Sequence, residues 1–76
     1  MYKIIFDEKV IQFMEKLDYN IRFNIFDNLR IIKKDPLEFA KRLNEVYLIQ
    51  LDKFRVIVDI DKKSKLIKIL FIKRNK

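Results

Sequence analysis

The 76-residue sequence contains no cysteine, histidine, glycine or tryptophan, and it has a single proline. Without cysteine there are no disulfides or thiolate metal sites, and without histidine the commonest catalytic base and metal ligand is missing. These absences exclude cysteine–histidine dyads, serine–histidine–aspartate triads and ordinary zinc sites. We therefore expect neither a metal nor another cofactor. Because glycine is absent, we also expect the turns to form without its freedom to adopt positive φ.

The length predicts one small domain, residues 1–76, which buries only ~60% of the surface that its unfolded chain would expose. Residues 2–6 are a short segment interrupted by Lys3 and do not resemble the apolar core of a signal peptide. No apolar run is long enough to cross a bilayer. We expect a cytoplasmic protein with no membrane contact.

Positive charge is concentrated at one end of the sequence. Residues 62–76 contain seven basic side chains and no acidic one, whereas residues 1–19 contain three basic and four acidic side chains. A localised basic segment predicts contact with a polyanion, although it is also what a solvated turn and a frayed tail would show. The side chains that we expect to contact nucleic acid are Lys53, Lys62, Lys63, Lys65, Lys73 and Lys76.

Two helices are predicted after a first strand at residues 2–6. Asp7 is the expected cap of the first helix, whose apolar stripe consists of Val10, Phe13, Met14 and Leu17. Asn20 is the expected cap of the second helix, whose apolar face consists of Ile21, Ile25, Leu29 and Ile32. Pro36 ends that helix because the residue before a proline is pushed out of the helical region. Residues 37–43 are expected to add a short helical turn.

Two phenylalanines of the second helix, Phe23 and Phe26, do not both fit its apolar face. At least one should therefore be lateral or exposed. We favour a wide apolar face wedged between the first helix and the sheet. The alternative is a contact for a partner chain.

Three β-branched runs follow, at residues 47–51, 54–60 and 66–74, and predict an antiparallel meander. The fold class is therefore α+β, with two N-terminal helices on one face of a mainly antiparallel sheet in the order β-α-α-β-β-β. In the middle run one face is wholly apolar, and the other carries Arg55, Ile57 and Asp59. Because two helices cover only one face, the other requires a partner or self-association.

The order of these features resembles the RelE/ParE superfamily of toxin–antitoxin toxins over about residues 2–74. The resemblance rests on Lys34-Asp35-Pro36, the strand at residues 47–51, Phe54-Arg55 and the closing Ile72-Lys73-Arg74. It implies a RelE-like microbial ribonuclease-type fold and, for the RelE branch, a messenger-RNA endoribonuclease (mRNA interferase) acting on the ribosome. It also implies a cognate acidic, RelB-like antitoxin that forms a hetero-oligomer with the toxin.

Carried over position by position, the resemblance assigns catalytic roles to Arg55 and Arg74, with Lys73 as a lesser candidate. A guanidinium can donate two parallel hydrogen bonds to a developing phosphoryl charge, but it is a poor base. Asp59 is a conceivable carboxylate base for the 2′-hydroxyl. If Arg55 is instead structural, it should pair with Asp59 or Glu45.

This sequence departs from the family pattern at two places. Leu48 and Gln50 stand where well-studied members carry basic residues, and no tyrosine follows Arg74. Two alternatives therefore accompany the endoribonuclease: a catalytically weakened member that binds RNA, the ribosome or the antitoxin, and a ParE-like inhibitor of DNA gyrase. The basic C-terminal segment favours an RNA substrate over a protein surface.

Overall fold

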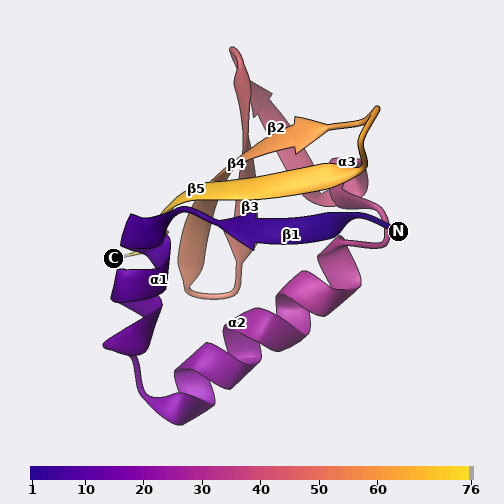
Figure 1. Cartoon of the computed structure of the whole chain (residues 1–76). Coiled ribbons are helices and arrows are strands. Elements are labelled where there is room, and N and C mark those ends of the chain that lie inside the picture. Colours follow the sequence, from indigo (N-terminus) through magenta and orange to yellow (C-terminus); the bar gives the residue numbers. More distant parts are fainter. Residues whose placement is uncertain (76) are drawn as a thin grey trace.

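The structure is a computed structural model and describes residues 1–75. A five-stranded sheet has the order β1-β5-β4-β3-β2, in which β1 is parallel to β5 and the other neighbours are antiparallel (Figure 1). Along the chain the elements are β1 (Lys3–Phe6), α1 (Glu8–Glu15), α2 (Tyr19–Ile32), α3 (Pro36–Phe39), β2 (Ala40–Leu43), β3 (Val46–Leu51), β4 (Phe54–Asp61) and β5 (Leu66–Arg74).

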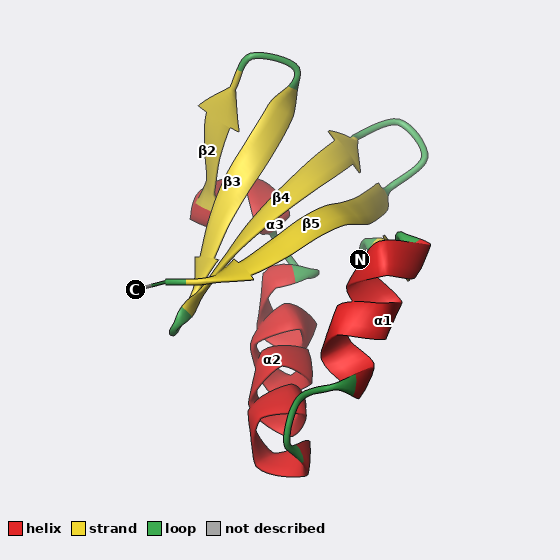
Figure 2. Ribbon diagram, turned by 90° about the vertical axis from the view of Figure 1, so that its left-hand side faces the viewer, coloured by secondary structure: helices red, strands yellow, loops and turns green. Residues whose placement is uncertain are grey.

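The core lies between the sheet and the first two helices, which run side by side on one side of the strands (Figure 2). Val10 and Met14 come from α1, and Ile25, Leu29 and Ile32 from α2. The sheet contributes the inward residues of β3, β4 and β5, among them Ile49, Val56, Val58, Ile67 and Ile69. The expected α+β architecture is confirmed. Among residues 1–75, no helix has the length and apolar character needed to cross a membrane.

The two helix starts differ from each other. Asp7 caps α1 as expected, because its carboxylate accepts a hydrogen bond of 3.1 Å from the backbone amide of Lys9. The prediction that Asn20 caps α2 is wrong. The helix begins at Tyr19, after an extended Asp18 whose side chain makes no capping hydrogen bond. Asn20 therefore lies in the first turn, where its side chain lines a groove described below.

The chain between Pro36 and Leu43 forms more than the expected helical turn. Residues Pro36–Phe39 form α3, since proline has no amide hydrogen to lose at a first helical position. The following Ala40–Leu43 forms a fifth strand, β2, which pairs with β3 from Ala40 opposite Ile49 to Leu43 opposite Val46. The expected order β-α-α-β-β-β therefore lacked one strand. The segment contains good helix formers, so pairing along β3 overrides its local preference.

The turns form without glycine, and three other residues adopt positive φ. Asn44 has φ 54°, Asp52 has φ 51° and Lys65 has φ 58°. Asparagine and aspartate tolerate this region better than other side chains, whereas a lysine there costs about 1–2 kcal/mol. The turn before β5 is therefore strained.

Candidate nucleic-acid interface

The surface of the sheet that faces away from α1 and α2 is called the open sheet face. Along β4, buried and outward side chains alternate as the sequence predicted. The core side is formed by Phe54, Val56, Val58 and Ile60, and the open sheet face by Arg55, Ile57 and Asp59. A register shift between Ile57 and Val58 leaves Leu70 without a partner in β4 and pairs Ile57 with Phe71. The shift brings Phe71 to the open sheet face, and alternation alone would not have revealed it.

Arg55 occupies the middle of a polar row across three strands. It pairs with Gln50 of β3 on one side and with Lys73 of β5 on the other. Directly opposed residues in antiparallel strands have Cβ atoms about 4.5–5.5 Å apart, and two like charges in such a pair are destabilising. Arg55 and Lys73 therefore form a cationic pair that an anion would stabilise.

Beside this row the open sheet face is hollowed. A depression of about 200 Å³ is lined by Leu43, Leu48, Arg55, Ile57, Phe71 and Lys73. Its lining thus combines two cations with four apolar side chains. Phe71 is 54% exposed and so offers a large aromatic surface beside the cations. Aromatic surface next to positive charge is what proteins use to bind unstacked bases together with their phosphates.

Gln50 fixes the turn that precedes Arg55. Its Nε2 donates hydrogen bonds to the backbone oxygens of Asp52, at 2.8 Å, and Phe54, at 3.1 Å. Because Arg55 follows Phe54 directly, these two hydrogen bonds fix the backbone that carries the Arg55 side chain. The sequence marks Gln50 only as a missing basic residue and does not reveal this positioning role.

Arg55 has no acidic partner within the described chain. The ion pair present in residues 1–75 joins Arg30 to Asp27, so the structural alternative of a pair between Arg55 and Asp59 or Glu45 is not observed. Asp59 lies four residues along β4, about 13 Å from Arg55 at the usual strand rise, and pairs in register with Lys68. That separation places the Asp59 carboxylate too far from a phosphate bound at Arg55 to act directly as its base.

Arg74 lies on the other face of the sheet. It is opposite the buried Phe54, and its Cζ is 5.1 Å from the centre of the Phe54 ring. There it lines a groove of about 260 Å³ between α2 and the turn joining β3 to β4. The two arginines expected to act together therefore project from opposite faces of the sheet.

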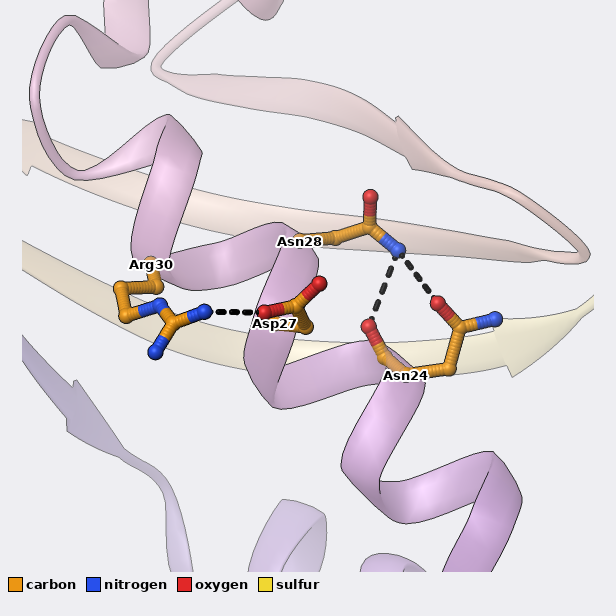
Figure 3. A network of polar contacts seen from close by, with 4 residues as sticks. All are labelled: Asn24, Asp27, Asn28 and Arg30. Carbon is orange, nitrogen blue, oxygen red and sulfur yellow. Dashed lines mark hydrogen bonds and ion pairs between the residues drawn. The ribbon is translucent and has the colours of Figure 1, made fainter.

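The far wall of this groove belongs to α2 and carries the asparagines at positions 20, 24 and 28. Asn28 Nδ2 donates to the backbone oxygen of Asn24 at 2.9 Å and to Asn24 Oδ1 at 3.1 Å (Figure 3). Asn24 Nδ2 in turn donates to Asp52 Oδ2 at 3.4 Å. These hydrogen bonds connect α2 to the turn joining β3 to β4, so the asparagines of the groove wall hold the helix and the turn together.

The lysines expected to bind nucleic acid do not form one patch. Lys73 is beside Arg55, and Lys53 lines the groove at the adjoining turn. Lys62, Lys63 and Lys65 lie in the turn between β4 and β5, at the other end of strands that are about 25 Å long. Lys76 lies outside the described residues.

The turn between β4 and β5 is ordered by Asp61. Its Oδ1 accepts hydrogen bonds from the backbone amides of Lys63, at 3.0 Å, and Ser64, at 3.3 Å. The side-chain hydrogen bond from Ser64, followed by these two amides, lowers the pKa of the Asp61 carboxyl below its usual value of 3.8. The carboxylate therefore stays charged and anchors a turn rich in lysine.

The protein is a two-layer α+β domain in which helices cover one face of the sheet and leave the other face open. No protein-family model matches the sequence, and no curated protein sequence matches it either. Solved structures do match. A chain of the toxin–antitoxin complex RelBE2 from Mycobacterium tuberculosis superposes with a TM-score of 0.88 at 18% identity, over 97% of this chain and 98% of that chain.

Two further structures support the same fold. The isolated RelE toxin from E. coli has a TM-score of 0.80 at 18% identity, over 100% of this chain and 86% of that one. A chain of the archaeal RelE–RelB complex from Pyrococcus horikoshii has a TM-score of 0.78 at 22% identity, over 96% and 93% of the two chains. The chain therefore has the RelE toxin fold.

Proposed function

We propose that this protein is the toxin of a type II toxin–antitoxin system and inhibits translation in the cytoplasm by cutting messenger RNA on the ribosome. The RelE fold supports the assignment over nearly the whole chain. The observation that carries it furthest is the pair formed by Arg55 and Lys73, two cations opposed across neighbouring strands beside an apolar hollow. Such a pair is arranged to receive a phosphate.

The proposed reaction is attack of an RNA 2′-hydroxyl on the adjacent phosphorus, with expulsion of the 5′-oxygen. The products are a 2′,3′-cyclic phosphate and a 5′-hydroxyl, and the proton lost by the nucleophile is balanced by the proton gained by the leaving oxygen. The Arg55 guanidinium would donate to the non-bridging oxygens as negative charge builds up on them. Lys73 would add a second positive charge to the same phosphate. Since Asp59 is too distant, proton transfer falls to Lys73 or to a group of the ribosome.

Arg74 takes a smaller part in this proposal because it projects from the helix-covered face. It would contact a backbone phosphate of a neighbouring stretch of RNA, together with Lys53 at the adjoining turn. Loss of Arg74 would then weaken ribosome or RNA binding and make it less dependent on salt, since one fewer counterion is released.

The test is ribosome-dependent cleavage of messenger RNA by purified protein. Arg55→Ala should slow cleavage by ~100-fold or more, because the interaction it removes develops in the transition state. Lys68→Ala is the matched control. It removes a cation from the same face and a neighbouring strand, about 13 Å away, and should leave the rate within about threefold. Equal losses in both variants would show that only the general positive charge of this face matters.

A second candidate, a binder without catalysis, is favoured by one observation. The side chain of Gln50 is committed to the turn, and Leu48 forms part of the hollow, so neither supplies the basic group expected at those positions. Wild-type protein that binds ribosomes but leaves messenger RNA intact would establish this alternative. Inhibition of DNA gyrase with intact messenger RNA would instead establish the ParE-like activity.

The proposed partner is an acidic, amphipathic antitoxin. The M. tuberculosis match comes from a toxin–antitoxin complex and the P. horikoshii match from a RelE–RelB complex. Here the open sheet face combines apolar surface with Arg55 and Lys73. A partner that binds only the folded toxin raises stability by ~4 kcal/mol at a free concentration ~1,000 times its dissociation constant. Co-expression with the product of a small neighbouring gene should therefore raise the melting temperature, and an unchanged melting temperature would contradict the partnership.

A further inference from the structure

The outer side of α2 carries a row of large exposed side chains that the core does not use. Tyr19 is 70% exposed, Phe23 60% and Phe26 46%. Together with Arg30 they recur at spacings of four, three and four residues, which places them along one side of the helix. We call Tyr19, Phe23, Phe26 and Arg30 the aromatic stripe. It is distinct from the core face of α2 and from the asparagine wall of the groove.

The side chains of the stripe are held in place. The rings of Tyr19 and Phe23 stack with their centres 6.2 Å apart, and Phe26 packs edge-on against Phe6 of β1 at 6.0 Å. Arg30 forms an ion pair with Asp27 (Figure 3). The expectation that one of the two phenylalanines is lateral or exposed is confirmed for Phe23, whereas the favoured wide apolar face between α1 and the sheet does not include this residue. Large aromatic side chains that are exposed and adjacent are typical of an interaction site.

A shallow apolar hollow adjoins the stripe. It measures about 120 Å³ and is lined by Phe6, Ile11, Met14, Glu15, Arg22 and Phe26. An apolar cavity of about 150 Å³ can hold a benzene ring, so this hollow can receive the edge of an aromatic side chain. The same surface thus has both projecting rings, at Tyr19 and Phe23, and a depression that such a ring would fill.

We propose that this surface binds a second copy of the chain, with the two α2 helices antiparallel across a two-fold axis. The numbering of the stripe is self-complementary. The midpoint between Tyr19 and Arg30 lies between positions 24 and 25. The midpoint between Phe23 and Phe26 lies at the same place. An antiparallel pair therefore sets Phe23 against Phe26 and its hollow, and Tyr19 against Arg30, twice each, as an isologous interface requires.

Charge favours a second copy over an acidic partner at this surface. Residues 7–32, which comprise α1 and α2, contain four basic and five acidic side chains, whereas the whole chain has a net charge of +7. Two copies can approach through this nearly neutral part without strong repulsion. An acidic polypeptide would gain no electrostatic attraction here and would be drawn to the basic remainder of the molecule. Antiparallel α2 helices also place opposite dipole ends together, and Arg30 can stack on the facing Tyr19 ring.

The experiment is sedimentation velocity from about 1 µM to about 1 mM, the range of weak and moderate association. Wild-type protein should convert from monomer to dimer within this range. Phe23→Glu should raise the dimer dissociation constant by ~100-fold, because the change occurs twice in each dimer at its centre. Ile31→Glu is the matched control: Ile31 is 53% exposed on the same helix but outside the stripe, so its dimer should persist. Circular dichroism checks that all three proteins are folded.

Thermal unfolding supplies an independent readout, since the melting temperature of a dimer rises with protein concentration. Wild type and Ile31→Glu should show this rise, and Phe23→Glu should not. A wild type that stays monomeric throughout the range would overturn the proposal, as would a dimer that Phe23→Glu leaves intact. Neither outcome depends on whether the protein cuts RNA, so this inference and the proposed function fail separately.

Discussion

Arg55 and Arg74 project from opposite faces of the sheet, and their replacement by alanine should therefore have opposite effects on activity and stability. The Arg74 guanidinium lies 5.1 Å from the centre of the buried Phe54 ring. A cation–π contact at an exposed site contributes about 0.5–1 kcal/mol. In a domain of 60–100 residues, 1 kcal/mol corresponds to about 4–8 °C, so Arg74→Ala should lower the melting temperature by about 2–8 °C. We expect it to keep cleavage within about tenfold of wild type, since it would remove one phosphate contact.

Arg55→Ala should show the reverse pattern. Its side chain is exposed and has no acidic partner among the described residues, so the change in stability should stay within about 0.5 kcal/mol. Removal of the repulsion from Lys73 could make that change slightly favourable. Cleavage, in contrast, should fall by ~100-fold or more, which corresponds to ~2.7 kcal/mol of transition-state stabilisation.

The assay is a pair of measurements on the same preparations: the melting temperature by circular dichroism and the single-turnover rate of ribosome-dependent cleavage. Arg55→Lys is a useful third variant because it keeps the charge but loses the planar fork, and it should recover only part of the rate. The reasoning is refuted if Arg55→Ala destabilises the protein as much as Arg74→Ala does, or if both variants lose cleavage equally.

Three further predictions concern stability. Lys65→Gly should leave the melting temperature nearly unchanged, because relief of about 1–2 kcal/mol at φ 58° is offset by ~0.5–1 kcal/mol lost with the contact between Lys65 Nζ and the Tyr2 ring and ~0.5–1 kcal/mol from the more flexible unfolded chain; a clear decrease would contradict this balance. The pKa of Asp61 is lowered in the folded state, so the stability that its carboxylate contributes is present above the unfolded-state pKa and is lost as pH falls through the folded-state pKa. Ser64→Ala removes the hydrogen bond that lowers this pKa most, so its melting temperature should fall less steeply below about pH 4 than that of wild type. An unchanged pH profile would count against this prediction. Ile69→Ala should cost about 2–5 kcal/mol in chemical denaturation because Ile69 is 1% exposed, and a cost below about 1 kcal/mol would show that the site collapses around the cavity.

Local patterns predicted most of the fold. The apolar stripe of α1, the cap at Asp7 and the alternation along β4 each follow from periodicity or from one side chain near a helix end, and the structure confirms them. The strand β2 could not be predicted in the same way. Its short sequence has no strand signal, and its conformation depends on pairing with β3, a tertiary interaction.

Sequence reasoning singled out Arg55 and Lys73 for the candidate site but missed Gln50 and Phe71 and the geometry that joins them. The isolated Arg55 within an apolar strand marked a candidate site residue, and its functional role stays a prediction. The faces occupied by Phe71 and Arg74 depend on the register shift in β5, which single-strand alternation cannot show. Lys53 and Lys73 lie at one end of the sheet and Lys62, Lys63 and Lys65 at the other, because the length of β4 and β5 separates them in space.

Because the first strand, β1, pairs with β5 near the C-terminus, the sheet can be completed only late in synthesis. Within residues 1–75, β1 has β5 as its neighbour in the sheet, and Lys3 lies opposite Leu66. During synthesis β1, α1 and α2 leave the ribosome long before β5 is available, so the helices have no complete sheet to cover. Lys73 also reaches its place beside Arg55 only when β5 joins the sheet. A nascent chain therefore lacks the cationic pair until β5 has emerged and joined the sheet.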